Sequence, residues 1–187
     1  MSAIVESIPY TGYGVDASGY LTGITGLKFP TLWLGVSGSE VQQPTIGPSV
    51  AAGSTLTLVE ATHNGKLIKL DTAAGSTVTL PASTGNGARY RFTVSVLATS
   101  NNHIVKVANA TDVMTGIIMT VSDDAGAPVK GYGTAASSDT ITLNRSTTGS
   151  VQLGEFIELE DYVAGFFRVT GMTFSTGTEA TPFSATV

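Results

Sequence analysis

From Ser49 to the C-terminus, apolar and polar residues alternate in short runs, and this period of two leaves few folds open to the chain. The run Ala88–Val96 shows it most clearly: Tyr90, Phe92 and Val94 fall on one side, and arginine, threonine or serine residues fall on the other. Side chains in a strand point alternately to the two faces of a sheet, so such a run predicts a strand with one buried face. No stretch keeps a helical period for three turns, and we therefore expect negligible helix.

Nine such runs follow one another at intervals of about 8–12 residues, separated by turn sequences rich in glycine and asparagine. They predict an all-β fold in which residues 49–187 form an antiparallel β-sandwich or jelly-roll-like domain. Asn64-Gly65 is typical of a type I′ hairpin turn. Two runs begin with Ser-Thr and then alternate threonine with an apolar residue, which we attribute to one buried sheet face rather than to a repeat. The runs are Ser54–Glu60, Lys66–Asp71, Ser76–Leu80, Ala88–Val96, His103–Val107, Val113–Val121, Thr140–Leu143, Phe156–Glu160 and Phe166–Thr170.

Residues 1–48 have a different composition. They hold four of the seven prolines and eight glycines, a density that opposes helices and central strands. They also carry five large aromatic side chains, which favour burial against an apolar surface. We therefore expect an irregular N-terminal arm that becomes ordered against a partner; the alternative is a segment folded back on its own domain. The candidate partner-interface residues are Tyr10, Tyr13, Tyr20, Phe29 and Trp33.

Charge and cysteine content narrow the classes of function. Only 12% of the residues are charged, against about 25% in an ordinary soluble domain, which suggests that much of the surface contacts other protein; a monomer coated with serine and threonine is the alternative. The nine basic residues are scattered and the net charge is −5, so we expect no nucleic-acid binding. No apolar window approaches the roughly 18 residues of a membrane span. The absence of cysteine and of a signal-peptide pattern predicts synthesis in a cytoplasm.

Residues that could carry out chemistry are few. His63 and His103 lack metal-ligand spacing to each other or to paired carboxylates, and we interpret both as polar turn residues. Asp123-Asp124 and the acidic group within Glu155–Asp161 could bind a cation, but we favour edges that are solvated or paired with arginine and lysine. We therefore expect a non-enzymatic protein with no catalytic residues, no cofactor and no metal.

Part of the strand domain resembles a known family. The residues that carry the resemblance are Thr55-Leu56-Thr57-Leu58, Gly65-Lys66, Leu70-Asp71, Ala74-Gly75-Ser76-Thr77-Val78-Thr79-Leu80-Pro81, Gly85-Asn86-Gly87-Ala88-Arg89-Tyr90-Arg91-Phe92, Val105-Lys106-Val107-Ala108 and Asp139-Thr140-Ile141. Over about half of the chain, the sequence resembles virion structural proteins of tailed bacteriophages that decorate or cement the capsid. The resemblance implies a place on the capsid surface of the virion, binding to the major capsid protein, and a homo-oligomer in which a trimer is favoured. It implies no active site.

Two other functions stay open at this point. A phage head or tail fibre segment or a baseplate component is the alternative within viruses. A carbohydrate-binding β-sandwich module is the alternative from another class, and it would need a planar aromatic patch. The exposed candidates for such a patch, Tyr132, Tyr162 and Phe166, are not clustered in the sequence.

Overall fold

The computed structural model describes residues 14–15, 21–22, 33–36, 39–42, 49–126 and 128–187. The chain divides into two compact units, residues 1–45 and 46–187. In the first unit, two antiparallel strand pairs are described: β1 (Gly14–Val15) with β2 (Leu21–Thr22), and β3 (Trp33–Val36) with β4 (Ser39–Gln42).

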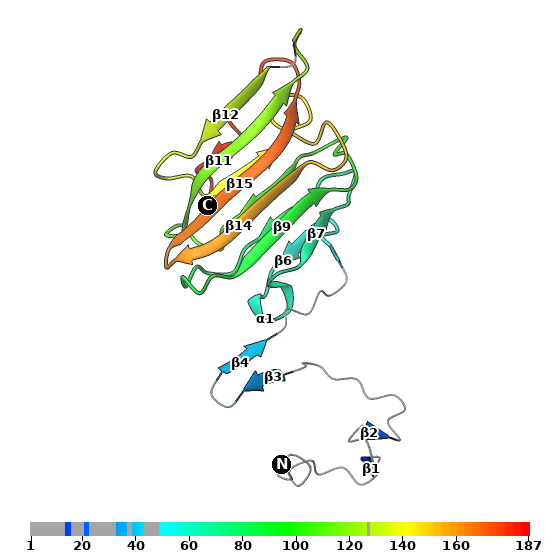
Figure 1. The fold of residues 1–187 in the computed structure, drawn as a ribbon. Coiled ribbons are helices and arrows are strands. Elements are labelled where there is room, and N and C mark those ends of the chain that lie inside the picture. The colour runs from blue at the N-terminus through cyan, green and yellow to red at the C-terminus, as the bar shows by residue number, and fades with distance from the viewer. Residues whose placement is uncertain (1–13, 16–20, 23–32, 37–38, 43–48, 127) are drawn as a thin grey trace. The chain divides into compact units, whose positions relative to one another are not determined.

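The second unit is built from two sheets, and the all-β prediction is confirmed. Each of the nine predicted runs overlaps a strand, and three of these strands extend beyond the C-terminal end of the run. A four-residue helix, α1 (Glu60–His63), is the one α-helix of the described residues. The seven-stranded sheet (Figure 1) has the order β12 (Val129–Gly133), β11 (Val113–Ser122), β15 (Phe166–Ser175), β14 (Phe156–Val163), β9 (Arg89–Val94), β7 (Leu67–Leu70) and β5 (Val50–Ala51). The five-stranded sheet has the order β16 (Phe183–Ser184), β13 (Thr140–Leu143), β10 (His103–Lys106), β8 (Thr77–Thr79) and β6 (Thr55–Thr57).

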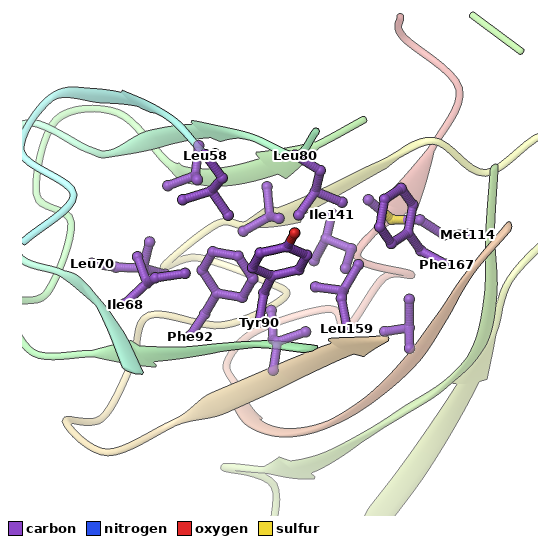
Figure 2. Close-up of a cluster of buried hydrophobic side chains, with 14 of the residues drawn as sticks. Leu58, Ile68, Leu70, Leu80, Tyr90, Phe92, Met114, Ile141, Leu159 and Phe167 are labelled. Atoms are coloured by element: carbon purple, nitrogen blue, oxygen red, sulfur yellow. The ribbon is translucent and has the colours of Figure 1, made fainter. Parts of the chain in front are cut away.

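One hydrophobic core joins the two sheets (Figure 2). Phe92 and Leu159 of the seven-stranded sheet and Val78 and Ile141 of the five-stranded sheet are all fully buried in it. Removing a side chain of this size from water contributes roughly 1.5–3 kcal/mol. Along β9 and β15 every second residue is buried, as the period of two predicts, so the opposite side of the seven-stranded sheet points away from the core. We call that side the outer face.

Strand pairing is mixed in both sheets, which corrects the antiparallel expectation. From β5 to β11, each strand lies in the opposite sheet from the strand before it, so the chain crosses between the layers at every connection. Each crossing reverses the chain direction, and two crossings restore it. For this reason β5, β7 and β9 are parallel neighbours, and so are β6, β8 and β10. The long strands β11 and β15 also pair in parallel.

The crossing of the chain between the two sheets corrects two smaller expectations. The two Ser-Thr runs are neighbours in one sheet, with Leu56 of β6 in register with Val78 of β8, so their likeness reflects equivalent positions on successive turns of the chain. Asn64-Gly65 does not form a hairpin, because β6 and β7 belong to different sheets. Asn64 has a φ of −57°, whereas a type I′ turn needs positive φ at both central residues.

Candidate interaction surface

Most of the predicted partner-interface residues lie outside the described part of the chain. Tyr10, Tyr13, Tyr20 and Phe29 are among them. Trp33 begins β3, and its side chain is also outside the described structure. The second unit has a different candidate surface, formed by other residues.

The outer face carries a group of exposed apolar side chains over β12, β11 and β15. They form one contiguous group: Met119 lies beside Met172 in register, and Met172 lies beside the half-buried ring of Phe156. Contiguous exposed apolar side chains on a sheet face are candidates for a protein-binding surface. We call the exposed residues the outer-face patch: Ile117 (54% exposed), Met119 (41%), Val129 (58%) and Met172 (54%).

Two glycines keep the β12 side of the patch flat. Gly131 is in register with Met119, and Gly133 is in register with Ile117. Neither glycine raises a side chain above the sheet, so the flanks of Met119 and Ile117 stay open toward the free side of β12. A partner can therefore approach the patch from above and from that side.

Sequence reasoning missed this patch, although a signal was present. In the run Val113–Val121, Met114 and Ile118 point into the core while Ile117 and Met119 point outward. A strand that is apolar on both sides is normally covered on both sides. The composition of the run predicts a strand, but it does not identify what covers the second apolar face.

A row of charges crosses the outer face next to the patch. Arg89 donates from Nη2 to Glu160 Oε1 at 2.9 Å, and Arg168 forms an ion pair with the other carboxylate oxygen of Glu160. The hydrogen bond from Arg89 and the charge of Arg168 hold the pKa of Glu160 below its ordinary value. The expected pairing of a carboxylate with arginine is thus confirmed for Glu160. The three side chains, with Glu158 and Thr170, line a shallow hollow of about 230 Å³.

The outer face has more positive than negative groups, although the whole chain has a net charge of −5. Arg91 lies over the ring of Phe156, 5.3 Å from its centroid, where charge and patch meet. Exposed ion pairs contribute only about 0–1 kcal/mol to stability, so the row matters more for the choice of a partner than for the fold. The basic residues at outward positions are Lys69, Arg89, Arg91 and Arg168, and the acidic ones are Glu158 and Glu160.

A second acidic group lies where β11 ends. Oxygen atoms of Asp123, Asp124 and Glu179 come within 4.8 Å of one another. Glu179, however, already forms an ion pair with Lys130 and accepts a hydrogen bond from Ser122 Oγ. The Lys130 hydrogen bond is the main reason that the pKa of Glu179 falls to about 2. The expected pairing of an acidic group with lysine is thus found for Glu179.

His103 is not a turn residue, which corrects the interpretation from sequence. It opens β10 and is fully buried. Its Nδ1 accepts a hydrogen bond from the Ser76 amide at 3.1 Å, so Nε2 carries the proton and donates to the Val96 carbonyl at 2.8 Å. Burial lowers the pKa of His103 and keeps the ring neutral. His63 is also not a turn residue: it is the last residue of α1, and its Nδ1 accepts a hydrogen bond from the Val59 amide at 2.9 Å.

Asp161 holds a loop in place. It accepts hydrogen bonds from the backbone amides of Thr84 and Gly85 at 2.8 and 2.9 Å and from Ser83 Oγ at 2.6 Å. Burial acts to raise its pKa, but these hydrogen bonds outweigh burial and leave the pKa of Asp161 below its ordinary value. The β14 strand thereby anchors the connection between β8 and β9.

Glu155 does the same for another loop. Its carboxylate accepts the amides of Ser150, Val151 and Gln152 at 2.8, 2.6 and 2.7 Å. Burial raises the pKa of Glu155. The carboxylates of Glu155 and Asp161 are thus bound to the backbone of the protein itself.

The fold defines a class, a two-layer all-β protein, and the outer-face patch is its candidate interaction surface. Comparison with family models, curated proteins and solved structures gave no match to the chain. Within the described ranges, no helix is long and apolar enough to cross a bilayer. Of the aromatic candidates for a sugar-binding patch, Tyr132 packs partly buried against the core, while Tyr162 and Phe166 are exposed where β14 turns into β15.

Proposed function

We propose that this chain is a non-enzymatic structural protein of a tailed-phage virion, a decoration or cement subunit that binds the major capsid protein and further copies of itself. The observation that carries the proposal is the outer-face patch on a rigid sheet, with a row of charges beside it. Covering this patch with protein would remove apolar surface from water, at about 25 cal/mol per Å². A cement subunit gains its binding energy in this way, without chemistry.

The buried polar groups support a structural role. Asp161, Glu155 and His103 have their hydrogen-bonding atoms bound to nearby amides, carbonyls or hydroxyls. These side chains hold loops and strands in one conformation. A stiff scaffold of this kind suits a subunit that must present a fixed surface to its neighbours.

The charge of the outer face favours a capsid surface of the opposite charge. Four basic side chains against two acidic ones favour a partner with an acidic rim around an apolar centre. Attraction of this kind mainly accelerates association and weakens with salt. Binding to the shell should therefore be faster at low ionic strength.

Residues 1–48 are proposed to attach the subunit to a neighbour or to the capsid. The support is in the sequence: an arm of 48 residues can extend to about 160 Å, and its five aromatic residues are of the kind enriched at binding hot spots. Deleting residues 1–48 should leave a folded domain with reduced binding, and Trp33→Ala should give a partial form of the same defect. An unfolded deletion variant, or one that binds at full strength, would rule out the arm.

The patch is tested by cosedimentation with undecorated shells of the major capsid protein from the same virus. Met172→Lys should weaken binding about tenfold or more, which corresponds to roughly 1.4 kcal/mol, because it places a charge inside the covered patch. Val59→Lys is the matched control, since Val59 is also 54% exposed but lies outside the patch. Equal binding of both variants would exclude the patch as the contact. Failure of the unmodified chain to bind shells, together with binding to glycans, would favour the carbohydrate-binding alternative instead.

A further inference from the structure

β12 is the longest edge strand in the two sheets. It has five residues, whereas β5, β6 and β16 have two, three and two. An edge strand presents unpaired N–H and C=O groups, and proteins usually shorten such strands or shield them with charged side chains. In β12 the one charged residue is Lys130, and it is held in an ion pair by Glu179. No strand among the described residues covers this edge.

The hydrogen bonds to β11 show which backbone groups of β12 are free. The Ser122 amide donates to the Pro128 carbonyl, and the Thr134 amide donates to the Gly116 carbonyl. In an antiparallel pair, hydrogen-bonded positions recur at every second residue, so Lys130 and Tyr132 are the residues that bond to β11. Val129, Gly131 and Gly133 therefore direct their N–H and C=O groups away from β11, along the free edge.

We propose that this edge pairs with the same edge of a second copy of the chain, antiparallel across a twofold axis at Gly131. In this register, all three residues whose backbone groups lie along the free edge form hydrogen bonds. Gly131 bonds to the partner's Gly131, and Val129 bonds to the partner's Gly133. A register centred on Lys130 would place two lysines directly opposite each other, which is unfavourable. A register centred on Tyr132 would leave Val129 unpaired.

The side chains fit the same register. On the inner side, Lys130 comes opposite the partner's Tyr132, so that its aliphatic stem can pack on a ring. On the outer side, the branched side chain of Val129 comes opposite the partner's Gly133, where an added β carbon would meet nothing within 4 Å. The two glycines that weaken β12 as a single strand thus leave room for another backbone to approach closely.

Pairing would also enlarge the interaction surface. Adjacent strands lie about 4.8 Å apart, so Met119 of each copy would be separated by only the two Gly131 residues. The outer-face patches of the two copies would then form one apolar face. The inference deepens the proposed self-association, but it concerns the chain alone and can be tested without any capsid. A twofold edge contact can coexist with a threefold contact elsewhere on the subunit, in which case it joins two trimers.

Disulfide trapping in the full-length chain tests the register, because the natural sequence has no cysteine. In the proposed pair the two Gly131 Cα atoms are about 5.5 Å apart, within the range for a disulfide. The two Val129 residues are four positions out of register, about 14 Å along the strand, which is too far. Under mild oxidation, Gly131→Cys should give a covalent dimer and Val129→Cys should not. Equal cross-linking of both variants, or cross-linking of neither, would overturn the proposal.

A proline at the same position tests the hydrogen bonds. Gly131→Pro removes an N–H that points outward and leaves the bonds to β11 intact, and proline is tolerated at such edge positions. In sedimentation of the full-length chain, this variant should have half the mass of the unmodified assembly, whereas Gly131→Ala should keep the full mass. An unchanged mass for the proline variant would contradict edge pairing. If the proline variant fails to fold by circular dichroism, the cysteine pair decides.

Discussion

At the scale of single residues, Gly116 sets how closely β11 and β15 approach. Its φ is 149°, and an added β carbon would lie 1.9 Å from the Val169 carbonyl oxygen. Gly116→Ala should therefore lower the free energy of unfolding by about 3 kcal/mol or more, through overpacking and backbone strain, as measured by urea denaturation. Gly133→Ala, on the neighbouring strand, adds the same atom in open space and should change stability by about 0.5 kcal/mol at most. Similar losses in both variants would contradict this account.

His103 makes stability depend on pH near neutrality. Because burial lowers the pKa of the folded-state ring below the ordinary value of about 6.5, the unfolded chain takes up a proton first as the pH falls. The stabilising contribution is fully present above about pH 6.5 and declines below it, by up to about 1.4 kcal/mol per pH unit. Unfolding free energies at pH 7.5 and 5.5 should differ in the natural chain and differ less in His103→Gln. The same pH slope in both proteins would show that another group is responsible.

At the scale of elements, buried carboxylates connect strands to loops. Asp161→Asn should lower the free energy of unfolding by about 1.5–3 kcal/mol, because the single side-chain oxygen of asparagine cannot accept the hydrogen bonds of both the Thr84 and the Gly85 amide, and its NH2 group faces one of these donors. Glu158→Gln, on the outer face of the same strand, should have little effect. Chemical denaturation at pH 7 measures both. A loss at Glu158 as large as that at Asp161 would contradict the anchoring role.

The elements also show how far sequence reasoning reaches. The alternation of Tyr90, Phe92 and Val94 predicts both the strand β9 and its buried face, because a strand's side-chain period depends on local geometry alone. Asp161 shares the buried face of Ile157 and Leu159, so its position in the alternation predicts a structural carboxylate and separates it from Glu158 and Glu160 on the outer face. The parallel pairing of β11 with β15 has no comparable local signal, since it depends on where the chain goes between the two strands.

At the scale of the whole molecule, the second unit has a fully buried core, but parts of its surface lack the partners that such groups normally have. The two sheets bury their shared faces, while the outer-face patch and the free edge of β12 leave apolar side chains and backbone groups without a partner within the described structure. The low content of charged residues, 12%, is consistent with a chain that meets other protein over much of its surface. In an assembly, other protein would cover the outer-face patch and pair with the edge of β12.

Sedimentation velocity of the unmodified chain at micromolar concentration, alone and mixed with undecorated capsid shells, measures this directly. We predict a species heavier than the 19.1 kDa monomer in the chain alone, and transfer of the chain to the fast-sedimenting shells in the mixture. A single 19.1 kDa species that shells leave unchanged would contradict the proposed role as an assembly subunit.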